Sequence, residues 1–316
     1  MHAAPRPAPP AEPIAGSILS VDDLADDQIA YILDLADHYA GLRRLGALAP
    51  RPLVGRTLVN LFLEPSTRTM ASFEVAAQRL GADVLSLPAE GSSLRKDESG
   101  LDTALTLAAM GADVMVVRSK EAGLQPLLAK RLSCPIVNGG DGAAEHPTQA
   151  LLDAATLRAA KGRIDGLTVA IVGDIAHSRV AGSGAKLLAR LGARVRFVGP
   201  DALMPAGFAD IPRFETLRDG LEGCDAVMAL RIQRERMADA ETPDAGAFFA
   251  TYGLTHETLA LAKPDAVVMH PGPMNRGVEI DGDLADDDNH SLVLKQVAYG
   301  VFTRMAILDA LLSGRA

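Results

Sequence analysis

Short apolar runs rich in Val, Ile and Leu alternate with helical patterns along most of the chain, and this alternation constrains the fold more than any other feature. Strands that alternate with helices predict parallel sheets covered by helices on both faces. The expected strands are residues 57–63, 83–87, 113–117, 135–138, 167–174, 194–198, 225–230 and 266–270. The expected helices are a first one from Val21 to about Gly46, one after Ser66, 101–110, 122–131, 147–161, one from about Ser178, and 292–312.

The long helical pattern over 147–161 separates two series of strands, and a length of 316 residues suits two domains. We therefore expect an α/β fold of two doubly wound parallel-sheet domains, 17–150 and 151–291, with the ligand site in the cleft between them. The pattern of the last helix fits packing on either domain; we assign 292–316 to the first. The two α/β halves share no internal repeat of near-identical residues.

Residues 1–16 contain five prolines and lack the continuous apolar core of a secretory signal, so we expect a disordered arm and a cytoplasmic protein. Acids or bases interrupt every apolar run, which excludes a membrane-spanning helix.

Composition narrows the function classes further. The chain is 48% hydrophobic and 22% charged, the balance of a compact globule. Its net charge of −9 argues against nucleic acid as a partner. The two cysteines, Cys134 and Cys224, provide neither a disulfide framework nor a cysteine-based zinc site.

The segment 64–69 directly follows a buried strand and opens a helix, so hydroxyls, a guanidinium and free backbone N–H groups converge at one helix N-terminus. The residues concerned are Ser66, Thr67, Arg68 and Thr69. This arrangement predicts an anion site. Taken alone, the four residues are explained equally well by a Ser or Thr N-cap followed by a solvated arginine.

A second polar loop precedes the helix 147–161. His146 and Gln149 lie at its start, and Pro147 occupies the first helical position, where a missing N–H is tolerated. A histidine before a proline is more often a helix cap than a catalytic residue. Here, however, this loop and the loop 64–69 are expected to face the same crevice, which favours a functional role for His146.

Four arginines follow predicted strands in this acidic protein: Arg68, Arg118, Arg179 and Arg231. One such arginine is ordinary, and Arg231 with Arg234 and Arg236 could belong to a basic surface helix. Together they suggest a pocket for a multiply anionic ligand. The turn at Gly173 lacks the dinucleotide fingerprint, and no acid ends the next strand, which argues against a nicotinamide cofactor.

Two further segments are ordinary when taken alone. The turn 270–273 carries two prolines, which stiffen it and leave carbonyls facing outward because proline has no N–H. The segment 91–98 is polar and basic at its centre, as a solvated loop is.

Six segments together occur in the order and spacing of the carbamoyltransferases, and the chain resembles that family from about residue 17 to its end. They are Ser66-Thr67-Arg68-Thr69, Ser93-Leu94-Arg95-Lys96, His146-Pro147-Thr148-Gln149, His177-Ser178-Arg179, Arg231-Ile232-Gln233 and His270-Pro271-Gly272-Pro273. The last two resemble the aspartate-specific members, whereas ornithine-specific members carry a cysteine-containing turn in place of 270–273.

The resemblance implies transfer of a carbamoyl group from carbamoyl phosphate to the amino group of L-aspartate, in pyrimidine biosynthesis, without a metal or an organic cofactor. The first domain would bind carbamoyl phosphate and the second aspartate. A carbamoyltransferase for another amino acid and a non-catalytic anion-binding homologue are the alternatives. A non-catalytic homologue would show a broken motif, and none of the six is broken.

The family also implies a role for each matching residue. The phosphate would be bound by Ser66, Thr67, Arg68 and Thr69. The carbamoyl oxygen would be surrounded by Thr69, Arg118 and His146, and the carbamoyl amide held by Gln149 and the carbonyls of Pro271 and Gly272. The two carboxylates of aspartate would be bound by Arg179 and Arg231, with Gln233 beside the amino group.

Family members are homotrimers in which Ser93 and Lys96 would enter the site of the neighbouring subunit, with Ser92 as the alternative loop serine. Larger assemblies with regulatory chains or dihydroorotase also fit the resemblance. Two positions depart from the family pattern. Met70 replaces a common arginine, and Gly272 stands where a larger residue is usual.

Overall fold

The computed structural model describes residues 5–88, 99–233, 237 and 243–313. The chain divides into two compact units, and each is an α/β domain with one parallel sheet. Unit 1 comprises residues 1–155 and 297–316, and unit 2 comprises residues 156–296. The predicted fold class, two parallel-sheet α/β domains, is confirmed.

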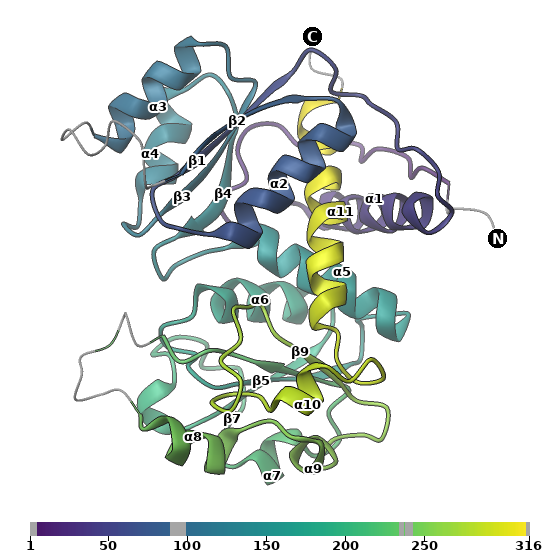
Figure 1. Cartoon of the computed structure of the whole chain (residues 1–316), viewed down its shortest axis with the longest axis vertical. Coiled ribbons are helices and arrows are strands. Elements are labelled where there is room, and N and C mark those ends of the chain that lie inside the picture. Colours follow the sequence, from purple (N-terminus) through teal and green to yellow (C-terminus); the bar gives the residue numbers. More distant parts are fainter. Residues whose placement is uncertain (1–4, 89–98, 234–236, 238–242, 314–316) are drawn as a thin grey trace. The chain divides into compact units, whose positions relative to one another are not determined.

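The sheet of unit 1 has the strand order β2-β1-β3-β4, and every pairing in it is parallel. Its strands are β1 (Thr57–Phe62), β2 (Asp83–Leu87), β3 (Val114–Ser119) and β4 (Ile136–Asp141). Its helices are α1 (Asp26–Arg44), α2 (Thr67–Leu80), α3 (Gly100–Ala109), α4 (Leu124–Arg131) and parts of α5 (Pro147–Lys161) and α11 (Val293–Leu312). Figure 1 shows α3 and α4 on one side of this sheet and α2 on the other.

The central strands of unit 1, β1 and β3, are buried on both faces. Val59, Leu61, Met115 and Val117 are at most 1% exposed and share a core cluster with Leu128 of α4. Burial on this scale supplies the main driving force for the sheet.

The first helix begins later than the sequence pattern predicted. Residues 21–23 form a separate 3₁₀ turn, and α1 starts at Asp26. The Asp23 carboxylate accepts the N–H groups of Leu19 and Ser20 at 2.7 and 2.8 Å, which closes the short turn. A second cap then starts α1, because the Gln28 side chain accepts the N–H of Ala25.

The proline-rich N-terminal segment has neither helix nor strand over residues 5–16, yet it is tethered to unit 1. The Arg6 guanidinium forms an ion pair of 2.8 Å with Asp309 of α11, whose side chain is fully buried. Tyr39 of α1 donates its hydroxyl proton to the same carboxylate, and Ile14 is buried. These contacts differ from the expectation of a disordered arm, because a buried carboxylate provides the arginine with a partner.

The sheet of unit 2 has the strand order β7-β6-β5-β8-β9 and is also parallel throughout. Its strands are β5 (Thr168–Val172), β6 (Arg194–Val198), β7 (Arg213–Phe214), β8 (Ala226–Ala229) and β9 (Val267–Met269). Its helices include α6 (Arg179–Arg190), α7 (Leu217–Leu221), α8 (Ala245–Tyr252), α9 (His256–Leu259) and α10 (Gly282–Ala285). In Figure 1, α6 lies on one face of the sheet and α7, α8 and α9 on the other.

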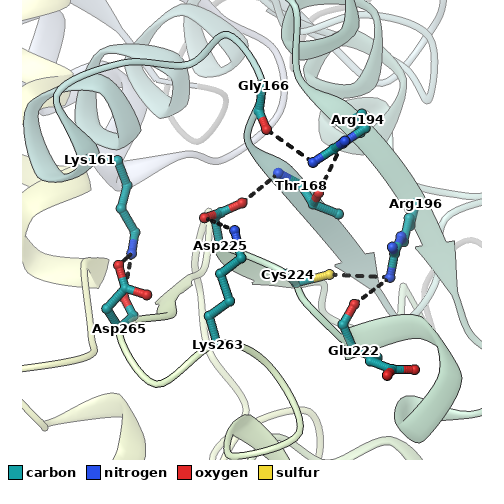
Figure 2. Close-up of polar contacts among 10 residues, drawn as sticks. All are labelled: Lys161, Gly166, Thr168, Arg194, Arg196, Glu222, Cys224, Asp225, Lys263 and Asp265. Atoms are coloured by element: carbon teal, nitrogen blue, oxygen red, sulfur yellow. Dashed lines mark hydrogen bonds and ion pairs between the residues drawn. The ribbon is translucent and has the colours of Figure 1, made fainter.

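Polar contacts tie together the edge of this sheet at which β5, β6 and β8 begin (Figure 2). Asp225 accepts the backbone N–H of Thr168 at 2.8 Å and the Lys263 ammonium at 2.6 Å. Arg196 donates to the carbonyl of Glu222, and Lys161 pairs with Asp265. This amino edge is therefore occupied by internal ion pairs.

None of the helices that the structure describes is both long enough and apolar enough to cross a membrane.

Candidate active site

Both sheets reverse their strand order at one point, and the motifs follow the strands at these points. In unit 1 the chain passes from β1 to β2 on one side and to β3 and β4 on the other, so the switch lies between β1 and β3. In unit 2 the corresponding switch lies between β5 and β8. Loops at the carboxyl ends of such neighbouring strands diverge and leave room for a ligand.

The segment after β1 forms the N-terminus of α2, as expected. Ser66 is the N-cap residue in an extended conformation, and its side chain makes no capping hydrogen bond to the helix. The first turn contains no acidic residue, Thr67 and Arg68 are exposed, and Thr69 is buried. The hydroxyl and the first-turn N–H groups can therefore receive an anion.

Arg118 extends from the end of β3 toward the same loop. It pairs in register with Phe62 of β1, and its side chain is 11% exposed. Its guanidinium donates to Glu64 Oε1 at 3.1 Å and to the carbonyl of Gly139 at 3.1 Å. These two bonds hold the cation beside the loop that opens α2.

His146 and Gln149 lie where β4 passes into α5. Both are buried, with exposures of 3% and 8%. Gln149 Nε2 donates to Asp153 Oδ1, one helical turn later, at 3.0 Å. The strands β1, β3 and β4 are adjacent in the sheet, so their carboxyl ends lie at one edge. All seven described candidate residues of unit 1 lie at this edge.

In unit 2, Asp174 connects the two candidate loops that follow β5 and β8. Its fully buried carboxylate accepts from His177 Nδ1 at 2.8 Å and from the backbone N–H of Gln233 at 3.0 Å. Two residues beyond His177, Arg179 opens α6 and is 5% exposed. One carboxylate thereby fixes the spacing between the Arg179 loop and the Gln233 loop.

The same two loops approach each other so closely that a side chain would not fit between them. Gly173 has φ +122°, and a Cβ there would lie 2.7 Å from the carbonyl oxygen of Leu230. Beyond this contact, the Arg231 guanidinium donates to Gln233 Oε1 at 3.1 Å. Arg231 and Gln233 therefore form one polar pair.

The turn after β9 is held from within by His270. The backbone N–H of Gly272 donates to His270 Nδ1 at 2.8 Å, so Nε2 carries the proton and donates to Glu279 Oε1 at 3.1 Å. Gly272 has φ +67°, which glycine adopts without strain. That conformation gives a physical reason for a glycine at this position, where the resemblance led us to expect a larger residue.

The candidate residues divide between the units. Unit 1 carries Ser66, Thr67, Arg68, Thr69, Arg118, His146 and Gln149, and unit 2 carries Arg179, Arg231, Gln233, Pro271 and Gly272. Ser92, Ser93 and Lys96 lie outside the described residues. Within the described ranges, no three His, Cys, Asp or Glu side chains are grouped as a metal site.

Sequence reasoning missed the residues that hold the candidate side chains in place. Glu64, Asp153, Asp174 and Glu279 each contact a candidate residue or its loop. A usable signal existed for Asp174, an acid at the end of an apolar strand, where burial without a partner would be costly. The others are acids in loops or helices and show no distinguishing pattern.

The two α/β units, each with an arginine-bearing loop at the switch point of its sheet, match a class of carbamoyl-group transferases with two substrate domains. Family models for the aspartate/ornithine carbamoyltransferase carbamoyl-P binding domain and Asp/Orn binding domain match residues 17–159 and 165–311. The chain belongs to the aspartate/ornithine carbamoyltransferase family.

Relatives named aspartate carbamoyltransferase catalytic subunit are similar over nearly the full length. The protein from Dinoroseobacter shibae is 52% identical over 94% of this chain and 95% of its own. The protein from Acidiphilium cryptum is 53% identical over 93% of this chain and 95% of its own.

Solved structures of the family share the fold. Aspartate transcarbamoylase from Trypanosoma cruzi, in complex with N-(phosphonacetyl)-L-aspartic acid, has a TM-score of 0.83 and 33% identity, covering 96% of this chain and 98% of that one. Ornithine carbamoyltransferase from Pyrococcus furiosus has a TM-score of 0.86 and 29% identity, covering 97% and 100%. The fold alone therefore does not distinguish the two amino acid substrates.

Proposed function

We propose that the chain catalyses the transfer of the carbamoyl group from carbamoyl phosphate to the α-amino group of L-aspartate, giving N-carbamoyl-L-aspartate and phosphate in de novo pyrimidine biosynthesis. The observation that carries the choice of aspartate is the Arg231–Gln233 pair at the switch point of unit 2. An arginine suits the second carboxylate of aspartate, whereas the side-chain ammonium of ornithine would be repelled there. The names of the relatives at 52% and 53% identity support the same choice.

Carbamoyl phosphate is assigned to the residues of unit 1. Its phosphate accepts from Ser66, Thr67 and Arg68 and from the first-turn N–H groups of α2. Its carbonyl oxygen lies among Thr69, Arg118 and His146. Gln149 and the carbonyls of Pro271 and Gly272 bind its amide.

Aspartate is assigned to the residues of unit 2. Arg179 and Arg231 bind its two carboxylates, and Gln233 lies beside its amino group. Asp174 supports this assignment because it holds both loops at a fixed spacing. Lys96 and Ser93 of a neighbouring subunit complete the site. The reaction requires the two sets of residues to meet in a cleft, which stays a prediction.

The reaction needs no covalent intermediate with the protein. The amine of aspartate attacks the carbamoyl carbon, and a C–N bond forms while the carbonyl becomes an oxyanion. Thr69, Arg118 and His146 stabilise that oxyanion, each well-placed donor contributing about 3 to 4 kcal/mol. The C–O bond to phosphate then breaks, and the departing phosphate takes the electron pair and the amine proton. His146 thus acts as a hydrogen-bond donor, and positioning of two anions supplies much of the remaining rate.

The protein is expected to act in the cytoplasm as a homotrimer with shared sites.

A colorimetric assay for the ureido product, with aspartate, ornithine and other amino acids as acceptors, tests the activity. We expect product only when aspartate is the acceptor. Product with another amine would establish the alternative substrate, and no product from a folded, carbamoyl-phosphate-binding chain would establish a non-catalytic homologue.

A further inference from the structure

A buried arginine lies behind the first turn of α5 in unit 1. Arg304 of α11 is 3% exposed. It donates to the carbonyl of Gly300 at 3.2 Å and to Thr148 Oγ1 at 3.4 Å, and its guanidinium carbon lies 5.0 Å from the centre of the Phe73 ring. The guanidinium is therefore surrounded by helices α2, α5 and α11, away from bulk water.

A cation in such a place needs an anion. Burial lowers the pKa of Arg304 to about 9, while the charge of Asp153 acts in the opposite direction and that of Arg118 adds to the lowering. Arg304 consequently remains charged at neutral pH. Asp153 is itself 2% exposed, and its negative charge favours the charged form of Arg304, so we refer to Asp153 and Arg304 as a pair of opposite buried charges.

Asp153 has a second contact, which points toward the candidate site. Its Oδ1 accepts from Gln149 Nε2 at 3.0 Å, one turn earlier on α5. A carboxylate has no proton to donate, so only the –NH₂ side of the Gln149 carboxamide can face it. The carbonyl oxygen, Oε1, must then face away from Asp153. With a neutral partner at position 153, either orientation of the carboxamide would be possible.

We propose that Asp153 is a positioning residue, with the buried Arg304 as its opposite charge: the Asp153 carboxylate orients Gln149 so that its Oε1 selects a substrate bearing an –NH₂ group. This inference rests on the proposed function, in which Gln149 binds the carbamoyl amide. A carbamoyl group donates a hydrogen bond to Oε1. An acetyl group presents a methyl in its place and would leave Oε1 without a partner.

The competing explanation is that the pair only joins α5 to α11. Single substitutions do not separate the two explanations, because each removes one charge from a buried region and changes its charge balance, which destabilises the fold. The double variant Asp153→Asn/Arg304→Gln removes both charges and keeps both side chains polar. It should fold, yet an asparagine can donate or accept and no longer dictates the orientation of Gln149.

The experiment measures kcat/KM for carbamoyl phosphate and the competitive inhibition constant of acetyl phosphate, in the unmutated protein and the double variant. We expect kcat/KM to fall about ten- to a hundredfold, while the inhibition constant changes less than about threefold. Circular dichroism and the thermal midpoint verify folding. The matched control Asp225→Asn/Lys263→Gln removes another ion pair at the amino edge of unit 2, and should leave both constants unchanged.

Three outcomes would overturn the inference. The folded double variant could keep the kcat/KM of the unmutated protein. Its kcat/KM for carbamoyl phosphate and its affinity for acetyl phosphate could fall by the same factor. The control variant could show the same selective loss of kcat/KM. Gln149→Ala distinguishes this failure from failure of the proposed function. If Gln149→Ala abolishes the preference for carbamoyl over acetyl phosphate and the double variant does not, only the role of the pair is wrong. If Gln149→Ala keeps the preference, the assignment of Gln149 is wrong as well.

Discussion

At the scale of single residues, the guanidinium of Arg118 is held through both terminal nitrogens by other residues of the protein. Nη1 donates to Gly139 and Nη2 to Glu64. Because Gly139 lies within β4 and Glu64 follows β1, the arginine links three adjacent strands. A donor oriented in this way does not have to reorganise when charge develops on the substrate, and this is how such groups lower a barrier.

Arg68 should be necessary for activity and dispensable for folding. It is the second residue of α2 and is exposed, so Arg68→Ala removes no core contact. Loss of a charged contact to the phosphate that tightens in the transition state should cost about 3 kcal/mol, roughly a hundredfold in rate. Steady-state kinetics of the purified variant measure it. Arg131→Ala, which replaces another exposed helical arginine of unit 1, should keep full activity; near-normal turnover by Arg68→Ala would remove Arg68 from the site.

Arg231 should determine the requirement for a dicarboxylic amino acid. Arg231→Ala removes the partner of the second carboxylate, so the KM for aspartate should rise about tenfold or more, with little change in the KM for carbamoyl phosphate. Initial rates with each substrate varied in turn separate the two constants, and Arg231→Lys should show a smaller rise. A variant that binds aspartate normally and carbamoyl phosphate weakly would reverse the assignment of the two units.

At the scale of elements, the sequence predicted well the strands in which apolar residues recur and the long helix that opens on a proline. The predicted bounds of β2, β6 and α5 agree with the structure to the residue. Apolar runs and a proline at the first helical position are local signals, and packing does not override them. The short elements β7, α7, α9 and α10 were missed because two to five residues are too few for a period to show, and α8 was missed although it has eight residues.

The candidate site was also predictable in part. Chemistry-bearing residues stand in motifs with fixed spacing, whereas their supports come from distant parts of the chain. Asp174 meets Gln233 across 59 positions, and Arg304 meets Thr148 across 156. Contacts of that kind depend on which strands and helices become neighbours, and no local pattern in one sequence encodes them.

The amino edge of unit 2 should make folding stability depend on pH. Burial raises the pKa of Asp225, but its bonds to Lys263 and Thr168 and the nearby charge of Lys161 outweigh burial and hold the pKa below the ordinary 3.8. A lowered pKa in the folded state means that the stabilisation is complete above the unfolded value and is lost as the pH falls through the folded one. Asp225→Asn should therefore lower the melting temperature by about 3 °C at neutral pH, and the difference should vanish in acid.

Thermal unfolding of both proteins from neutral pH down to about pH 2 tests this window. Asp265→Asn is the control, because Asp265 is 75% exposed and its pair with Lys161 should contribute little. A stability difference for Asp225→Asn that stays constant down to the lowest pH would show that its charge is not the cause.

At the scale of the whole molecule, the proposed trimer makes a prediction about mixtures. If each site combines Arg68 of one chain with Lys96 of the next around a closed ring, Arg68→Ala and Lys96→Ala trimers should each be nearly inactive. Every hybrid trimer contains one junction where an intact Arg68 faces an intact Lys96. Dissociation, mixing and reassembly should therefore restore about one site in three per hybrid. Verified hybrids that stay inactive would show that each site is built within one chain.

The division of unit 1 between the two ends of the chain determines the order in which the protein is completed during synthesis. The ion pair of Arg6 with Asp309 joins positions 303 apart, and Ile307, Leu308 and Leu311 of α11 are at most 1% exposed. Domains generally fold in the order in which the ribosome releases them. Here the second domain, a continuous stretch, can close first, whereas the first must wait for α11. The nascent N-terminal domain thus exposes an apolar surface until α11 has left the ribosome, so slow translation of the segment that contains α11 should prolong its dependence on chaperones.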